Sequence, residues 1–205
     1  MTTSQRLSAL TLTIGAVALV AACKGKNESY GSVDTAKPAA TDTTARAATP
    51  APAPALTDAN IVAILDAANE SDSAFGAMAV KKGKSADVKR FARMMMAEHH
   101  MLRAQGQQLA KKLNVTAAPP ANFDLPDKQH TAMVDLEAKN GADFDKAYID
   151  HEVEFHQVVI QTATQALNAA QNPELKDLIQ KAAPVLQKHL DEAKKIQAKV
   201  SGSTA

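Results

Sequence analysis

Residues 90–113, RFARMMMAEHHMLRAQGQQLAKKL, have the apolar periodicity of one long amphipathic α-helix. At about 100° per residue, its apolar side chains fall within roughly 60° of one direction. His99 lies on the same stripe. A buried imidazole needs a hydrogen-bond partner or a ligand, so we expect other helices to supply one. The apolar members of the stripe are Phe91, Ala92, Met95, Leu102, Leu109 and Leu113.

Three further segments have helical periodicity. The first begins at the capping pair Thr57-Asp58 and ends at Gly83, and Asp72 shares its apolar face. The third covers about residues 142–170, and its core face is ambiguous because it has two apolar stripes. One stripe comprises Phe144, Tyr148, Phe155 and Val158, and the other comprises Ile149, Val153, His156, Ile160 and Leu167. The fourth covers about residues 173–200, with His189 on its stripe. The apolar face of the first helix comprises Ile61, Ile64, Leu65, Ala68, Phe75 and Ala79.

Short turns join helices one and two, and helices three and four, whereas a proline-rich stretch separates the two pairs. We therefore predict an all-α fold, a ferritin-like four-helix bundle over residues 58–200 with a long crossover between helices two and three. Residues 128–139 are expected to form a short helix within that crossover. An up-and-down topology with a folded-over loop is the alternative.

The N-terminal region differs from the bundle. An apolar run after Arg6 and small residues before Cys23 are typical of a lipoprotein signal peptide over residues 1–22. Cys23 is the expected lipidation site, and residues 23–57 are an Ala/Thr/Pro-rich disordered tether. With Lys24 next, we expect attachment to the outer membrane and a periplasmic domain. A short membrane anchor or an ordinary cleaved signal is the alternative; residues 201–205 are expected to be a disordered tail.

The composition of the chain argues against several classes of function. The formal charge of +1 gives no electrostatic case for nucleic-acid binding. A single cysteine excludes an internal disulfide framework and a multi-cysteine metal site. We find no glycine-rich phosphate loop and no serine or cysteine nucleophile arrangement, so we expect no catalytic residues. A di-iron or copper oxidase is the less favoured alternative.

Several polar side chains are expected at mid-bundle. Counting from the turns places Asp72 near the level of His99, and His156 near that of His189, with offsets of roughly 3–5 Å. The residue types suit zinc, iron, copper or manganese. A metal-free polar network that fixes helix register is the alternative. The candidate ligands are Asp72, His99, His156 and His189, with Glu98 and Glu152 as helpers.

Other candidate ligands converge less well. Met94, Met95 and Met96 are soft thioether ligands suited to copper, but only Met95 lies centrally on the stripe, which favours core packing. The remaining histidines are expected to be solvated: His100, His130 and His151.

The order of motifs resembles the bacterial family called domain of unknown function 4142. The matching pieces are residues 72–76 (DSAFG), 88–96 (VKRFARMMM) leading to Glu98-His99, 144–148 (FDKAY) followed by His156, and 184–189 (PVLQKH). The family pattern usually has Glu at position 72 and Asp at position 98. The resemblance implies a secreted or envelope protein with a ferritin-like helical fold, and it favours His156 as the inward residue of helix three. It implies no established activity.

Overall fold

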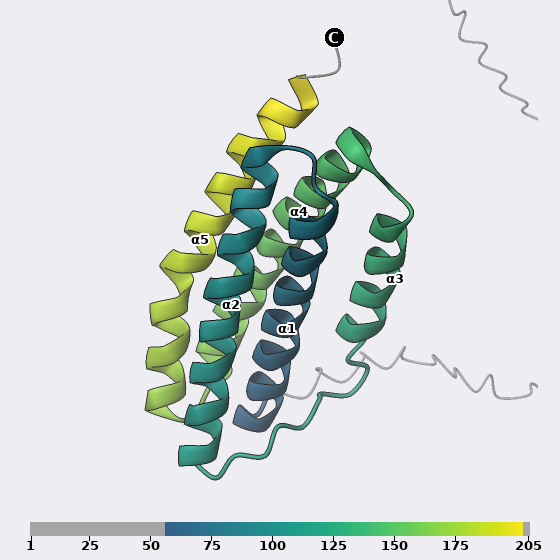
Figure 1. The fold of residues 1–205 in the computed structure, drawn as a ribbon. Helices are drawn as coiled ribbons and strands as arrows, with labels where there is room; N and C mark the ends of the chain where they lie inside the picture. Colours follow the sequence, from purple (N-terminus) through teal and green to yellow (C-terminus); the bar gives the residue numbers. More distant parts are fainter. Residues whose placement is uncertain (1–55, 203–205) are drawn as a thin grey trace, which may run out of the picture. The chain divides into compact units, whose positions relative to one another are not determined.

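The computed structural model describes residues 56–202, and within them the chain is all-α (Figure 1). The all-α class is confirmed. Predictions for the signal peptide, Cys23 and most of the tether lie outside the described residues. The five helices are α1 (Asp58–Lys82), α2 (Ala86–Lys112), α3 (Leu125–Glu137), α4 (Gly141–Ala169) and α5 (Pro173–Gly202).

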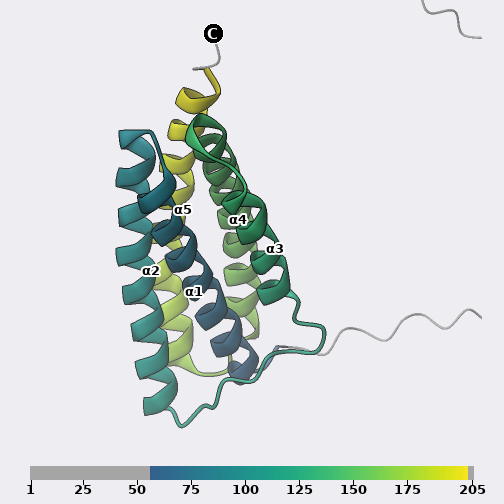
Figure 2. The same cartoon turned by 45° about the vertical axis from the view of Figure 1, so that its right-hand side comes forward.

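Four long helices form the core, and α3 lies outside them, as Figures 1 and 2 show. The closest pairs are α1 with α2 and α4 with α5, and the two pairs meet where α2 contacts α5 and α1 contacts α4. Gly83, at the end of α1, lies beside Gly141, at the start of α4. The segment from α2 to α4 therefore runs the length of the bundle, and α2 and α4 point the same way.

Local chemistry explains where the helices begin. Thr57 caps α1 in a reciprocal capping box with Asn60. Ser85 precedes α2 but makes no side-chain cap of its own. Asp145 of α4 holds the turn just before α2, because its carboxylate accepts hydrogen bonds from the backbone N–H groups of Lys84 (2.9 Å) and Ser85 (2.7 Å). The turn between α1 and α2 is thereby fixed to α4.

The opposite end of the bundle has an equivalent contact. The Asp58 carboxylate, in the first turn of α1, accepts hydrogen bonds from the backbone N–H groups of Gln171 (2.8 Å) and Asn172 (3.1 Å). These two residues form the turn between α4 and α5. Each hairpin turn is thus held by a carboxylate from the other hairpin.

The core has two apolar clusters. One, near the α1–α2 turn, contains Phe75, Phe91, Met95 and Tyr148 among others. Met95 is therefore a core residue, in line with the packing interpretation. The second cluster lies toward the α4–α5 turn. Its buried members are Ile61, Val62, Ala110, Ala163, Ala166, Ala170, Leu175, Ile179 and Leu186. The buried polar residues Asp72, His99, Glu152, His156 and His189 belong to neither cluster, and we call the region around them the polar layer.

The ambiguity on the third long helix is resolved by burial. Both predicted stripes of α4 are largely buried, through residues such as Tyr148, Ile149 and Phe155, whereas Val158 is 50% exposed. His151 corrects a prediction: it is not solvated, because its ring stacks on Phe75, with centroids 4.1 Å apart. Burial lowers its pKa to about 4.

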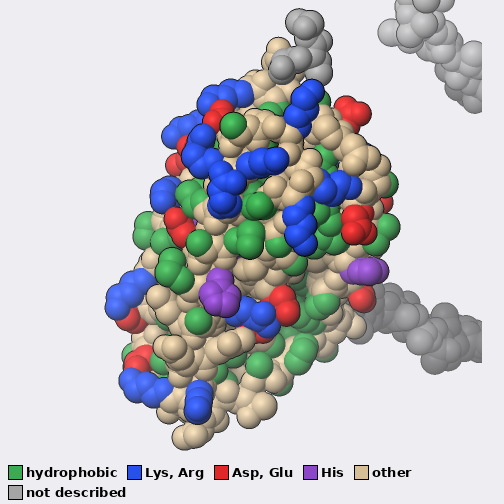
Figure 3. Space-filling model, in the orientation of Figure 1, with side chains coloured by type: hydrophobic (Ala, Val, Ile, Leu, Met, Phe, Trp, Pro, Cys, Tyr) green, Lys and Arg blue, Asp and Glu red, His purple; other side chains and the backbone are tan. Residues whose placement is uncertain are grey.

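The surface is mixed in character. On the face in Figure 3, Lys and Arg side chains stand among Asp and Glu side chains and scattered apolar groups. Three large apolar side chains are exposed in the described part of the chain: Met101, Val134 and Val158. None of the described helices is long and apolar enough to span a membrane. The closely grouped polar side chains lie inside the bundle and not on this surface.

Candidate metal centre

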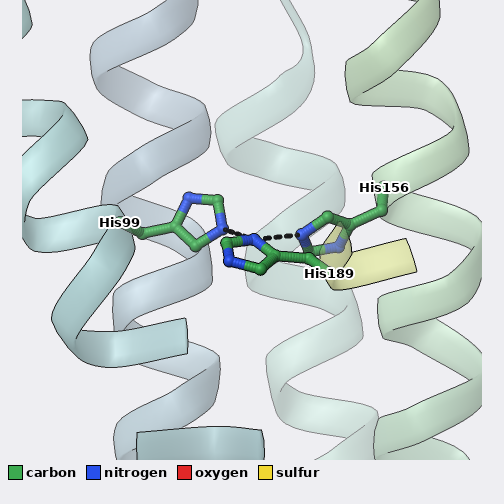
Figure 4. Close-up of side chains that lie close together, drawn as sticks. All are labelled: His99, His156 and His189. Atoms are coloured by element: carbon green, nitrogen blue, oxygen red, sulfur yellow. Dashed lines mark hydrogen bonds between the residues drawn. The ribbon is translucent and has the colours of Figure 1, made fainter. Parts of the chain in front are cut away.

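Three histidines from three helices meet in the polar layer. His99 comes from α2, His156 from α4 and His189 from α5 (Figure 4). Nδ1 of His189 lies 3.2 Å from Nε2 of His99 and 3.4 Å from Nε2 of His156. All three residues are at most 1% exposed. We call these three residues the histidine triad.

In each triad ring we call the nitrogen that faces the other two rings the inner nitrogen, and the one that points away from them the outer nitrogen. The outer nitrogen of His99 faces an oxygen. Its Nδ1 lies 2.9 Å from Oδ1 of Asn69 and 3.3 Å from Oδ2 of Asp72. The Asn69 amide nitrogen donates to the backbone carbonyl of Leu65, which leaves Oδ1 as the acceptor that faces the ring. His99 therefore carries its hydrogen on Nδ1, and Nε2 presents a lone pair to the triad.

The other two rings have the same arrangement. Nδ1 of His156 donates to the backbone carbonyl of Glu152 at 3.0 Å, one turn earlier in α4. Nε2 of His189 donates to Oε2 of Glu98 at 2.8 Å. Both acceptors are oxygens without a hydrogen, so Nε2 of His156 and Nδ1 of neutral His189 also present lone pairs to the triad.

Three lone pairs therefore converge when all three rings are neutral. Burial and the neighbouring rings lower the pKa of His99 to about 2, and burial with His189 nearby lowers that of His156 to about 4. The pKa of His189 is also lowered, mainly by burial. At neutral pH the rings favour the uncharged form, which is the form that binds metal. A single cation, or a single shared proton, would satisfy all three nitrogens.

Two carboxylates lie behind His156, at the contact between α1 and α4. One carboxylate oxygen each from Asp72 and Glu152 and one ring nitrogen of His156 lie within 4.8 Å of one another. Asp72 is 1% exposed and Glu152 is 0% exposed. Burial, then repulsion from Glu152, raises the pKa of Asp72 well above its usual value. Burial raises the pKa of Glu152 to about 8, opposed by the nearby Tyr148 hydroxyl.

An open cavity of about 360 Å³ leads toward this layer from the second apolar cluster. Its walls are mainly apolar, but Asn69, Asp72 and His99 line it as well. Arg103, in a salt bridge with Asp66, is also part of the lining. The cavity therefore gives a small solute a route to His99 and Asp72.

The chain also matches a known family. The profile of "Domain of unknown function (DUF4142)" covers residues 43–196. The chain belongs to the DUF4142 family. A comparison with curated proteins found no match.

Solved structures show the same helical fold as this DUF4142 domain. A presumed secreted DUF305 protein from Streptomyces coelicolor is 12% identical, with a TM-score of 0.61 over 70% of this chain and 93% of that one. CopM, solved in its Cu(II)-bound form, is 14% identical, with a TM-score of 0.58 over 71% of this chain and 99% of that one. At such identities the likeness concerns the fold alone.

The DUF4142 domain brings the sequence-predicted residues together in two groups. The histidines face one another, and Glu98 contacts the outer nitrogen of His189. Asp72 and Glu152 lie at the outer edges of His99 and His156 rather than among the triad nitrogens. The single cluster expected from the sequence is thus a triad with a separate acid pair.

Sequence reasoning missed two polar members of this layer. Asn69 holds the outer nitrogen of His99, and the signal for it was its position three residues before Asp72, on the same face of α1. Tyr148 was assigned to an apolar stripe, and its hydroxyl was not considered. A buried tyrosine usually places its hydroxyl near a polar group, here Glu152, four residues later in α4.

Proposed function

We propose that this protein is a lipid-anchored envelope protein whose bundle binds one transition-metal ion at the histidine triad. The ligand atoms would be Nε2 of His99, Nε2 of His156 and Nδ1 of His189. The observation that carries the proposal is that every outer nitrogen lies 2.8–3.0 Å from an oxygen that accepts a hydrogen bond, which leaves every inner nitrogen free to bind. Metal-binding histidines typically have their other nitrogen held in this way.

The donor set favours copper or zinc. Three neutral imidazoles suit Cu(II) and Zn(II) better than manganese, which prefers oxygen ligands, and Cu(II) binds such sites more tightly than Zn(II), Fe(II) or Mn(II). The structural neighbour CopM was solved with Cu(II), which supports copper without identifying its ligands here. We propose Cu(II) as the preferred ion and Zn(II) as its competitor, with water in the remaining positions.

The location and the finer fold assignment are part of the proposal. The signal-like residues 1–22 and the single cysteine, Cys23, support a lipid anchor in the outer membrane with the bundle in the periplasm. The presumed secreted DUF305 neighbour supports export. Two hairpins joined by a long crossover support a ferritin-like arrangement. In this setting the protein would sequester metal, not catalyse a reaction.

A metal-free polar network is the second candidate, and one geometry favours it. A proton on Nδ1 of His189 would be shared with His99 and His156, at 3.2 and 3.4 Å. The resulting imidazolium would face the Glu98 carboxylate at 2.8 Å. In that case the bundle would be an envelope stress or partner-binding module whose inward polar residues only fix helix register.

Metal analysis separates the two candidates. Protein without a histidine tag would be titrated with Cu(II) and with Zn(II) by calorimetry, and bound metal counted after desalting. We expect one equivalent, lost in His189→Ala and retained in His100→Ala, because His100 is exposed beside the site and serves as the matched control. Wild-type protein that binds neither ion, or His189→Ala protein that binds both as wild type does, would refute the triad.

A further inference from the structure

The acid pair at the α1–α4 contact has oxygens without hydrogen-bond partners. Both carboxylate oxygens of Asp72 and both of Glu152 are buried and accept no well-formed hydrogen bond. The hydroxyl of Tyr148, itself 0% exposed, lies near Glu152 but makes no well-formed hydrogen bond either. Buried polar atoms are almost always satisfied, so five such oxygens in one place indicate a missing partner.

No basic side chain supplies that partner. In residues 56–202 the only ion-pair contacts of Asp72 and Glu152 are with Nδ1 of His99 at 3.3 Å and Nδ1 of His156 at 3.4 Å. Each of these N–H groups has a closer acceptor, Asn69 at 2.9 Å and the Glu152 carbonyl at 3.0 Å. Two carboxylates without a countercharge are unstable in a dry interior, because each must be protonated or paired with a cation.

We propose that Asp72 and Glu152 bind a second divalent cation, of the oxygen-preferring class to which Mn(II) belongs. Two carboxylates match its charge of two, and oxygen is the donor such ions prefer. The Tyr148 hydroxyl lies beside Glu152, and Asp72 lines the cavity, through which the ion arrives with part of its water shell. The inference goes beyond the proposed function and does not depend on it, because no inner nitrogen of the triad is used.

The two groups then form adjacent sites of different chemistry. His156 stands between them, with Nε2 turned to the triad and Nδ1 toward Glu152. A nitrogen-lined site takes copper or zinc, whereas an oxygen-lined site takes a harder ion. Hence the acid pair should accept Mn(II) whether or not Cu(II) occupies the triad.

The test is Mn(II) binding to the full chain, followed by the loss of the free-ion electron paramagnetic resonance signal, with and without one equivalent of Cu(II). We expect one bound Mn(II) in both states and a loss of affinity of more than about 100-fold in Asp72→Asn/Glu152→Gln, which removes two charges from the ligand set. Asp143→Asn/Glu154→Gln makes the same charge change at exposed positions and should bind as wild type does.

The outcomes separate this site from the triad. His189→Ala should lose Cu(II) and keep Mn(II), so failure of the proposed function leaves this result unaffected. Wild-type protein that binds no Mn(II), or folded Asp72→Asn/Glu152→Gln protein that binds it normally, overturns the inference and assigns protons to the acid pair. If the double variant does not fold, Glu152→Gln alone decides by the same comparison.

Discussion

Oε2 of Glu98 lies 2.8 Å from Nε2 of His189, although the two residues are 91 positions apart in the chain. Burial would raise the pKa of Glu98, but the hydrogen bond from His189, with Lys188 close by, holds it below its usual value. An ionised Glu98 fixes the His189 tautomer that turns Nδ1 inward. This contact across α2 and α5 is therefore as much a part of the proposed site as the ligands.

Replacing Glu98 by Gln should weaken metal binding. The variant keeps the size of the side chain but removes the charge that orients His189, so we expect Cu(II) affinity to fall by about 10- to 100-fold. Competition with a chelator of known affinity measures it. Glu154→Gln is the control, since it makes the same change at an exposed position of α4. Equal affinity in wild type and Glu98→Gln would show that the contact does not tune the site.

Glu152 should make the metal-free protein less stable at alkaline pH. Its pKa is raised from 4.5 to about 8 in the folded state, so its protonated form stabilises the fold below about pH 4.5, and this contribution is lost as pH rises toward 8. Glu152→Gln cannot ionise. Measured in chelator by denaturant unfolding, its unfolding free energy relative to that of wild type should increase from pH 5 to pH 9 by about 2–4 kcal/mol. A constant difference over this range would contradict the prediction.

Asp145→Ala should destabilise the bundle by about 2–4 kcal/mol, because the backbone N–H groups of Lys84 and Ser85 lose a charged acceptor. Denaturant unfolding monitored by circular dichroism measures it. Asp143→Ala removes an exposed carboxylate from the same first turns of α4 and should cost less than about 0.5 kcal/mol. If the two variants unfolded at the same denaturant concentration, the contact of Asp145 with the turn would not stabilise the bundle.

Two glycines should respond to alanine in opposite ways. A Cβ at Gly76 would lie 2.8 Å from the backbone oxygen of Ala92, where α1 and α2 pack closely, so Gly76→Ala should destabilise by about 1–3 kcal/mol. A Cβ at Gly106 meets nothing within 4 Å, and Gly106→Ala should stabilise α2 by about 0.5–1 kcal/mol. Thermal unfolding of both variants tests the pair, and a shift in the same direction would contradict the close α1–α2 packing.

Much of the fold follows from the sequence because helix positions depend on local periodicity and caps. Thr57, Gly83 and Pro173 mark real helix boundaries. His99 and His189 lie on single narrow stripes, so their inward direction was predictable. His156 was not, because α4 buries a broad surface, and only the family resemblance favoured it.

The features that could not be predicted from the sequence depend on contacts between helices that are distant in the chain. His151 was expected in solvent, but Phe75 of α1 stacks on its ring. The sequence pattern of α4 alone does not predict that contact. The hydrogen bonds that Asp145 accepts from the α1–α2 turn join residues about 60 positions apart. The position of Asp72 outside the triad could not be predicted either. Counting residues along a helix gives the level of a side chain along the bundle axis, but not which ring nitrogen of His99 the carboxylate approaches.

The reciprocal turn contacts of Asp58 and Asp145 bear on how the protein opens. Asp145 of the α4–α5 hairpin binds the α1–α2 turn, and Asp58 of the α1–α2 hairpin binds the α4–α5 turn. The two hairpins therefore cannot separate without breaking the contacts at both ends of the bundle. Amide protons in all four long helices should therefore exchange with deuterium through one global opening event instead of hairpin by hairpin. An ion held between the two halves would slow that single event for the whole domain at once.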